Sequence, residues 1–370
     1  MEFIDLKKQY LGIKGAVDSR IESVINNANY IQGKEVEELE GELSNFIGSH
    51  CTSVANGTDA LYISLVALDI KAGDEIIVPS FTWVSTVQVV KQVGAVPVYV
   101  DIDIDTFNLN LNCISEKITP KTKAIIGVSL FGRCIDLRNL KLLCEKHNLK
   151  FIEDAAQSFG AMSENNLSCS IADISTTSFF PAKPFGCYGD GGAIFTNDKD
   201  LNEKVKIISK NGQIKRYDYK VVGCNSRLDT IQAAILLEKF AIFPNEIRKR
   251  TEIAKEYNSL LEGIDWLKLP QIPSDSNRSV WAQYTILLDD KIKDQRKLIM
   301  SLLKERNIPT ALYYPVPIHK SKPYEAKEEL PITENVADRV LSLPMHPYLE
   351  LSELKHVSIS IKEVFKDIGS

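Results

Sequence analysis

The sequence predicts an α/β protein built on a mostly parallel sheet, followed by a second, smaller α/β domain. Between residues 50 and 200, short runs rich in apolar and β-branched residues alternate with stretches of helical periodicity. The runs are apolar throughout, as is typical of parallel strands that are buried on both faces. Strands and helices that alternate in this way indicate a parallel sheet covered by helices on both sides.

The expected elements follow one another in a regular order. Strands are expected in DEIIVPS (74–80), VPVYVDID (96–103), TKAIIGVSLFG (122–132) and LKFIEDAA (149–156), and helices in STVQVVKQVG (85–94) and DLRNLKLLCEKHN (136–148). Each of these strand segments is seven to eleven residues long and contains a mainly apolar run, and each helix places apolar residues three or four positions apart.

A change of pattern follows Arg227 and predicts the second domain. A long helical stretch begins there, and we expect Pro244 to interrupt it because proline removes a helical hydrogen bond. A strand, VWAQYTILL (280–288), and a helix, KDQRKLIMSLLKERN (293–307), come next. We therefore expect a large domain over residues 1–240 and a small C-terminal domain over residues 241–370.

The composition excludes several classes of protein. The 370 residues carry a formal net charge of −5, which is not the basic footprint of a nucleic-acid-binding protein. The N-terminus has no apolar signal-peptide core, and no apolar run approaches the roughly 20 residues of a membrane span. The seven cysteines include no CxxC pair, so neither zinc nor a disulfide framework is expected. These features favour a reduced, cytoplasmic setting.

An acidic triplet imitates the start of a calcium-binding loop. Asp101, Asp103 and Asp105 have the spacing of an EF-hand, but its sixth and twelfth positions are Thr106 and Asn112 instead of Gly and Glu. No metal site is expected there.

Asp154 and Lys183 are the candidate catalytic residues. Asp154 ends an apolar strand, where ligands of open α/β sheets bind, although an aspartate there could also cap a helix. Lys183 lies in SFFPAKPFG, whose apolar neighbours would lower the pKa of the ammonium and leave a usable amine. Such lysines form Schiff bases with pyridoxal phosphate (PLP), whose pyridine nitrogen needs an acidic partner. The pair therefore predicts a PLP site.

Three further residues fit the phosphate of such a cofactor, and one fits its ring. Gly57 and Thr58 open an expected helix, so that backbone N–H groups and a hydroxyl would face an anion; an ordinary capped helix is the alternative. Ser178, shortly before Lys183, is another possible phosphate donor. Trp83 follows a strand and could cover the ring, although a tryptophan is more often part of the core.

Several motifs together resemble the DegT/DnrJ/EryC1/StrS family of sugar aminotransferases. They are GTDAL (57–61), PSFTWVST (79–86), FIEDAAQSFGA (151–161), SFFPAKPFGCYGDGGA (178–193) and GCNSRLDTIQAAIL (223–236), with FIDLKKQY (3–10) and LSLPMHPYL (341–349) near the ends. The resemblance extends over essentially the whole chain.

The resemblance implies PLP-dependent transferase fold type I. This fold has a large domain with a mostly parallel seven-stranded sheet, a smaller C-terminal α/β domain, and a homodimer with shared active sites. Lys183 resembles the Schiff-base lysine and Asp154 the partner of the pyridine nitrogen, while Gln157 resembles the contact to the ring hydroxyl. The remaining implied contacts are Trp83 on the ring, Gly57, Thr58 and Ser178 on the phosphate, and Asn225 on the phosphate of the other subunit.

The same resemblance narrows the substrate. KPFGCYGDGG (183–192), NRSVWAQYTI (277–286) and YYPVPIH (313–319) are most similar to enzymes that aminate UDP-2-acetamido-2-deoxy-3-oxo-D-glucuronate. L-Glutamate would be the amino donor, and the product would enter bacterial surface polysaccharide. Arg227 suits a carboxylate because its guanidinium binds in a bidentate manner, with an interface ion pair as the alternative. Tyr313 and His319 are candidate sugar or diphosphate contacts.

Other functions stay open. The substrate could be a dTDP-3-keto-6-deoxyhexose or a UDP-4-keto sugar. Some family members that carry histidine at the lysine position act as dehydratases, and Lys183 argues against that lyase chemistry. A non-catalytic regulator with the same fold is a further alternative, which the intact Asp154 and Lys183 disfavour.

Overall fold

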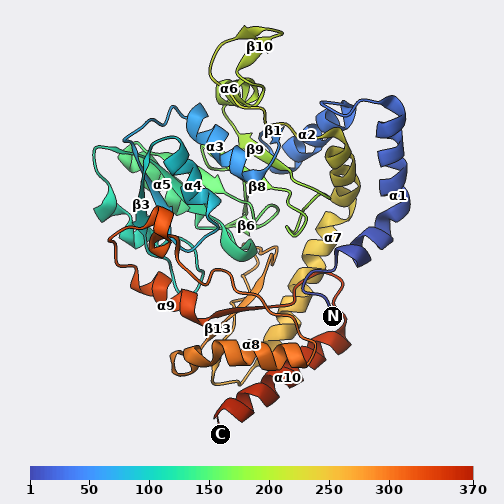
Figure 1. The fold of residues 1–370 in the computed structure, drawn as a ribbon, viewed down its shortest axis with the longest axis vertical. Coiled ribbons are helices and arrows are strands. Elements are labelled where there is room, and N and C mark those ends of the chain that lie inside the picture. The colour runs from blue at the N-terminus through green and yellow to red at the C-terminus, as the bar shows by residue number, and fades with distance from the viewer. Residues whose placement is uncertain (370) are drawn as a thin grey trace.

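The computed structural model describes residues 1–369 and contains a seven-stranded central sheet (Figure 1). Its strand order is β1-β9-β8-β5-β4-β2-β3, and every strand except β9 runs in the same direction. The strands are β1 (His50–Val54), β2 (Glu75–Pro79), β3 (Val96–Val100), β4 (Thr122–Val128), β5 (Lys150–Asp154), β8 (Ile174–Ser178) and β9 (Gly192–Thr196). The expectation of a mostly parallel seven-stranded sheet is confirmed.

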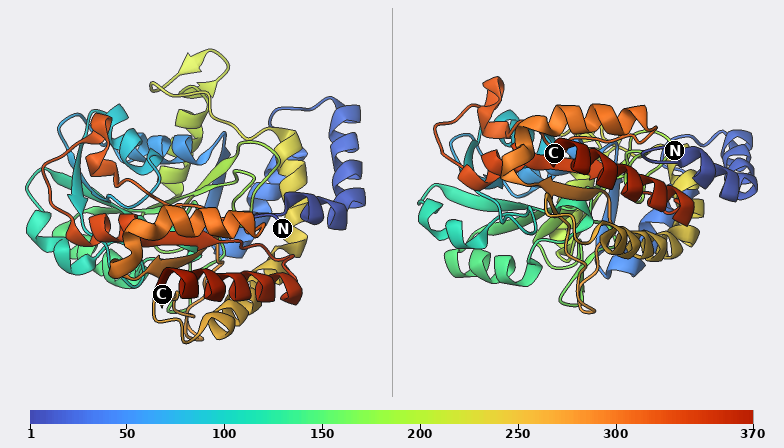
Figure 2. Two further views of the ribbon diagram at one scale, coloured as in Figure 1. Left: turned by 60° about the horizontal axis from the view of Figure 1, so that its bottom comes forward. Right: turned by 90° about the horizontal axis from the view of Figure 1, so that it is seen from below.

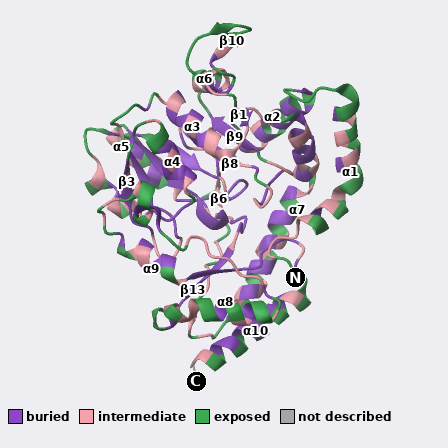
Figure 3. Cartoon of the chain, in the orientation of Figure 1, coloured by how far each residue is buried: buried purple, intermediate pink, exposed green. Residues whose placement is uncertain are grey.

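Helices cover both faces of this sheet. One apolar core joins the sheet to α2 (Lys34–Ile47), α5 (Leu137–His147) and the first half of α7 (Thr230–Leu261). A second core joins the opposite face to α3 (Gly57–Ala67), α4 (Ser85–Gln92) and α6 (Lys199–Ser209). In β5, Phe151 belongs to the first core and Ile152 to the second, which explains why the expected strands are apolar throughout. Figure 3 shows the buried sheet between these helices.

A second, smaller sheet lies in the C-terminal part. It consists of β12 (Leu267–Lys268), β13 (Tyr284–Leu288) and β14 (Val340–Leu343), all antiparallel. A third core joins this sheet to the second half of α7, to α8 (Arg296–Glu305) and to α10 (Leu351–Gly369). Figure 2, with the bottom of the molecule turned forward, shows α8 and α10 side by side. The helix α9 (Pro331–Arg339) precedes β14.

The expected interruption at Pro244 is wrong, because α7 continues across it as one helix of 32 residues. Phe243 and Ile247, on either side of the proline, are buried in the core of the large sheet. This packing outweighs the cost of proline in a helix interior, which is about 3 kcal/mol. The large-sheet core takes residues of α7 as far as Ile247, and the C-terminal core begins at Ile253. The division of the chain at residue 240 stays a prediction.

Two segments extend from this frame. The N-terminal helix α1 (Leu6–Asn27) packs along α7. A short hairpin of β10 (Gln213–Lys215) and β11 (Asp218–Tyr219) projects beyond α6, at the top of Figure 1. Another short pair, β6 (Met162–Ser163) and β7 (Asn166–Leu167), follows β5.

None of the helices described for residues 1–369 combines the length and apolar composition of a membrane span.

The acidic triplet after β3 has structural partners. Asp101 accepts hydrogen bonds from the N–H groups of Ile332 and Thr333, at 2.9 and 2.7 Å, and thereby caps α9. Asp103 accepts from the N–H groups of Asp105 and Thr106 and so shapes the turn. Asp105 forms an ion pair with Lys268.

Candidate active site

The candidate site lies at the carboxyl edge of the central sheet. Asp154 is the last residue of β5, Ser178 is the last residue of β8, and α3 begins at Gly57 shortly after β1 ends. Since β1, β5 and β8 run in the same direction, their carboxyl ends lie at one edge of the sheet. The fold thus brings together residues separated by more than a hundred positions in sequence.

Asp154 is buried and held by two donors. Its Oδ2 accepts a hydrogen bond from Thr86 Oγ1 at 2.8 Å, and its Oδ1 accepts from the Ala156 N–H at 3.2 Å. Burial raises the pKa of the Asp154 carboxyl, while Thr86, Ala156 and the Lys183 ammonium oppose the shift. A buried carboxylate beside a cation can pair with a protonated ring nitrogen of a bound ligand and thereby keep that nitrogen protonated.

Lys183 occupies a hairpin loop that connects β8 to β9. Ser178 and Gly192 pair with each other at the base of this loop, and within it the Lys183 N–H donates to the Phe180 carbonyl at 2.9 Å. Lys183 is partly buried, and desolvation lowers the pKa of its ammonium to about 8, against the attraction of Asp154. A substantial fraction of neutral amine is therefore present near neutral pH, as a nucleophilic lysine requires.

The N-terminus of α3 forms a tight cradle beside Ser178. A Cβ on Gly57 would lie 2.8 Å from Ser178 Cβ, and a Cβ on Gly192 would lie 2.6 Å from the backbone carbon of Asn56. Both glycines are therefore required by close packing, and this packing places the Ser178 hydroxyl next to the first turn of the helix. Thr58 Oγ1 hydrogen bonds with Ser85 Oγ at 2.7 Å. Free N–H groups and hydroxyls at a helix N-terminus suit a phosphate.

Gln157 and its neighbours form another side of the site. Gln157 Oε1 accepts from the Phe131 N–H, and its Nε2 donates to Tyr314 Oη, both at 2.9 Å. The Tyr314 ring centroid lies 6.3 Å from that of Trp83, with the planes tilted by 43°. Trp83 is 59% exposed, so it is not part of the core and its ring is free to cover a ligand.

Asn225 and Arg227 flank Ser226, whose Oγ accepts from the Ala55 N–H at 3.0 Å, shortly before α3 begins. Asn225 is exposed and follows the projecting hairpin. Arg227 lines a cavity of about 280 Å³, together with Glu37 and Glu40 of α2 and Lys206 and Lys210 at the end of α6. In the described part of the chain neither residue forms a hydrogen bond or ion pair with Asp154 or Lys183, and their expected roles stay predictions.

His319 has a structural position. It is fully buried, its Nδ1 lies 2.6 Å from Ser80 Oγ, and its Nε2 lies 3.1 Å from Glu334 Oε1. Both ring nitrogens are therefore engaged within the protein, and this position does not support the expected sugar or diphosphate contact. Tyr313 is partly buried and adjoins Tyr314, with ring centroids 5.9 Å apart.

Thr86, Ser85 and Tyr314 were not expected in the site. Thr86 and Ser85 begin α4 and bind Asp154 and Thr58, respectively. Their signal in the sequence was the end of PSFTWVST, in which only the tryptophan had been singled out. Tyr314 lies within YYPVPIH, where the preceding tyrosine had been chosen, because sequence alone does not reveal which of two neighbours faces the site.

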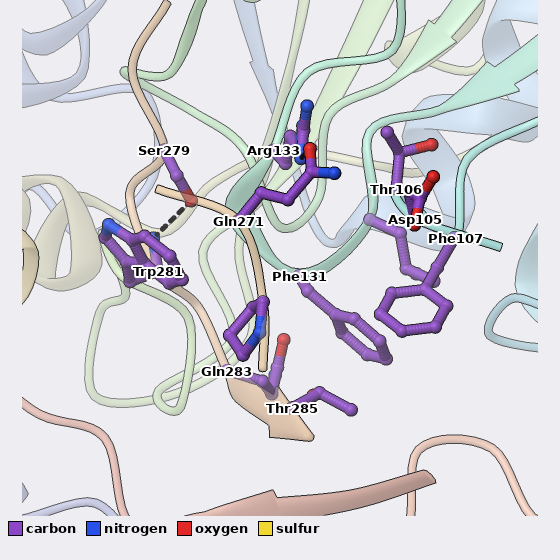
Figure 4. A pocket seen from close by; sticks show the side chains of 12 residues that line it. Asp105, Thr106, Phe107, Phe131, Arg133, Gln271, Ser279, Trp281, Gln283 and Thr285 are labelled. Atoms are coloured by element: carbon purple, nitrogen blue, oxygen red, sulfur yellow. Dashed lines mark hydrogen bonds between the residues drawn. The ribbon is translucent and has the colours of Figure 1, made fainter. Parts of the chain in front are cut away.

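A second, small cavity lies between the segments that follow β3 and β4 and the stretch 270–285, which includes the start of β13 (Figure 4). It has a volume of about 30 Å³, and Phe107, Phe131, Arg133, Gln271 and Trp281 are among its lining residues. This volume holds about one water molecule. The cavity adjoins the candidate site through Phe131 but contains none of the expected site residues.

Comparison with known proteins agrees with this geometry. The model of the DegT/DnrJ/EryC1/StrS aminotransferase family matches residues 13–362. A UDP-2-acetamido-2-deoxy-3-oxo-D-glucuronate aminotransferase from Pseudomonas aeruginosa is 46% identical over 363 residues, which is 98% of this chain and 99% of that protein.

Solved structures agree as well. A DegT DnrJ EryC1 StrS aminotransferase from Brucella abortus is 40% identical with a TM-score of 0.92, covering 98% of this chain and 99% of that one. NtdA from Bacillus subtilis, with bound cofactor PMP, is 31% identical with a TM-score of 0.89, covering 96% of this chain and 82% of that one. The match over nearly the whole length, together with a lysine and a buried aspartate at the sheet edge, shows that the chain belongs to the DegT/DnrJ/EryC1/StrS aminotransferase family.

Proposed function

We propose that this protein is a PLP-dependent aminotransferase that moves an amino group from L-glutamate to UDP-2-acetamido-2-deoxy-3-oxo-D-glucuronate. The observation that carries the proposal is the pairing of Lys183 with the buried Asp154 at the carboxyl edge of the sheet. The 46% identity to an aminotransferase named for this substrate supports the choice of sugar. We infer that the enzyme acts in the cytoplasm, in the synthesis of bacterial surface polysaccharide.

The residues present fit PLP. The cradle formed by Gly57, Ser178 and Gly192 offers helix N–H groups and a hydroxyl to a phosphate, and leaves no room for a side chain at either glycine. At the other end, Asp154 supplies a carboxylate for the pyridine nitrogen, and Lys183 supplies an amine with a lowered pKa. Gln157 is fixed by Phe131 and Tyr314 and would face the ring hydroxyl, with Trp83 over the ring.

Three residues of the site act in the reaction or hold another residue in place for it. When bound, PLP withdraws electrons from the carbon that bears the amino group. Lys183 would hold the cofactor through Nζ; once the donor's amine has displaced it, the same atom would carry a proton from the donor's α-carbon to the cofactor, and in the second half from the cofactor to the sugar carbon. Asp154 keeps a proton on the pyridine nitrogen. Thr86 holds the Asp154 carboxylate in place at 2.8 Å.

We infer further that two copies of the chain share their active sites. The segment that precedes Asn225 exposes apolar side chains, with Tyr217 at 74% and Val222 at 93%. An exposed apolar arm of this kind is typical of a surface that a partner covers. Asn225 of one subunit would then reach the phosphate of the other, and Arg227 would bind a substrate carboxylate.

The reaction run backwards tests this function. Purified protein is loaded with PLP, and the visible absorbance of lysine-bound PLP is followed while amino-sugar nucleotides are added singly. We expect a UDP-linked 3-amino uronic acid to remove the absorbance. Loss only with a dTDP-linked or 4-amino sugar would retain the aminotransferase but contradict the proposed substrate. The absence of this absorbance in wild-type protein would contradict the role of Lys183.

A further inference from the structure

A stripe of residues along α7 lies behind the loop that carries Lys183. The stripe consists of Gln232, Lys239, Phe243, Glu246 and Arg250, and its first three members contact the loop. Gln232 Oε1 accepts from the Tyr188 N–H at 3.0 Å, and a Cβ on Gly189 would lie 2.9 Å from Gln232 Nε2. Two turns further along, the Lys239 ammonium lies 5.0 Å from the centroid of the Tyr188 ring. Phe243, one turn beyond Lys239, packs on Phe185 with ring centroids 5.0 Å apart.

Lys239 is an unusual member of this stripe because it is a charged residue with only 2% of its surface exposed. Lysines are almost never buried to this degree unless they are paired. Its charge is balanced by Glu246, two turns further along the same stripe. Burial nevertheless lowers the pKa of the Lys239 ammonium to about 8. An apolar side chain would fill this position without that cost, so the ammonium calls for a specific explanation.

Glu246 connects the stripe on α7 to α1 and to the C-terminal part of the chain. Its carboxylate accepts from Gln9 Nε2 of α1, at 2.9 and 3.1 Å, and from the Tyr348 hydroxyl, which follows β14. The stripe continues to Arg250, whose Nη1 donates to the carbonyls of Trp281 and Met345 at 3.0 and 3.3 Å. The lysine loop, α1 and the C-terminal part thus meet on one helix.

We propose that Lys239 is a positioning residue for Lys183: its ammonium, seated against the face of Tyr188 and balanced by Glu246, fixes the loop Lys183–Gly192 on α7. This inference rests on the proposed role of Lys183. Cation–π attraction is strongest where water is excluded, as it is here. These contacts hold the loop residues from Phe185 to Tyr188 against α7. Lys183, at the start of the loop, is thereby kept at the site.

The test uses the capture of PLP by the protein without added substrate. Apo protein is equilibrated with increasing PLP and treated with borohydride, and PLP on the Lys183 peptide is measured by mass spectrometry. We expect Lys239→Met to require about tenfold more PLP for half-labelling, equivalent to about 1.4 kcal/mol. Lys239→Arg keeps the charge and should label like the wild type. Lys255→Met, at an exposed lysine of the same helix, is the matched control and should also label like the wild type.

Hydrogen–deuterium exchange separates positioning from a general loss of stability. In Lys239→Met we expect faster exchange in residues 179–192, with β5 and α3 unchanged. Tyr188→Leu, which removes the ring but keeps Lys239, should give the same two results and stands in if Lys239→Met does not fold. Wild-type labelling in both variants, with an unaltered loop, would overturn the inference. Failure of wild-type protein to capture PLP on Lys183 would instead overturn the role of Lys183, and this inference with it.

Discussion

Lys183 belongs to the loop between β8 and β9, and Lys239 of α7 packs against the same loop; burial lowers the pKa of both ammonium groups to about 8. The two side chains differ in how far solvent and ligands can reach them. Lys183 is partly exposed at the sheet edge and faces Asp154, whereas Lys239 is enclosed by Tyr188, Cys187 and Glu246. A lowered pKa of a lysine therefore indicates that its ammonium is desolvated. It indicates a reactive amine only where the side chain also lies at the accessible carboxyl edge of the sheet.

The largest effect is expected when the reactive member of this comparison is removed. Lys183→Ala should abolish attachment of PLP and lower the transamination rate by at least about 10³-fold, because nucleophile and proton carrier are lost together. Borohydride reduction followed by peptide mass spectrometry gives the measurement. If PLP were found on Lys239 in this variant, the distinction drawn from access would fail.

The next largest effect is expected at Asp154. Asp154→Asn should lower transamination by about 10²–10³-fold, because the pyridine nitrogen loses its anionic partner. Steady-state rates with saturating PLP would measure this loss.

Glu153, adjacent to Asp154, provides the matched control. Its buried carboxylate faces the other way and accepts from Ser129, Ser168 and the Cys169 N–H at 2.7 to 3.0 Å. Glu153→Gln should lower thermal stability and leave the rate of the folded enzyme within a few-fold. Equal loss of rate in both variants would contradict the assignment of Asp154.

On the Lys239 side, the next effect is expected on stability and is measured without the cofactor. Glu246→Gln leaves Lys239 and Arg250 without their buried counter-charge, so unfolding should become easier by about 3 kcal/mol. Denaturant or thermal unfolding of the apo protein measures the change. An unchanged midpoint would mean that Glu246 does not balance these cations.

The smallest effect is a pH dependence that separates Lys183 from surface lysines. With a pKa of about 8, its neutral fraction should rise about fivefold between pH 7 and pH 8 and level off above pH 9. The initial rate of PLP capture should follow this curve, since only the neutral amine attacks. A rate that still rises tenfold per unit above pH 9 would indicate an ordinary lysine.

The sequence predicted the parts of the fold that depend on local pattern. The strands β2, β4 and β5 were recognised because both of their faces are apolar, and Asp154 and Lys183 because polar groups stand out beside such strands. The continuity of α7 was missed because it depends on the packing of Phe243 and Ile247 against distant residues. The position of His319 depends on Ser80 and Glu334, and that of the Lys239 ammonium on Tyr188. Each of these three partners is more than ten residues away in the sequence, so local pattern does not reveal the contact.

β9 is the one reversed strand of the central sheet as described for residues 1–369. Its direction determines how the segment that contains Lys183 is connected to the sheet. Because β9 runs against β8, the chain leaves and re-enters the sheet at the same edge, and the Ser178–Gly192 pair closes the intervening segment. A parallel β9 would have required a crossover around the sheet, with Lys183 somewhere along it. The segment therefore has both ends fixed to neighbouring strands, while its middle packs on α7. A residue changed in its middle would therefore alter the contact with α7 and the surroundings of the amine together, while the strand ends that close the segment stay the same.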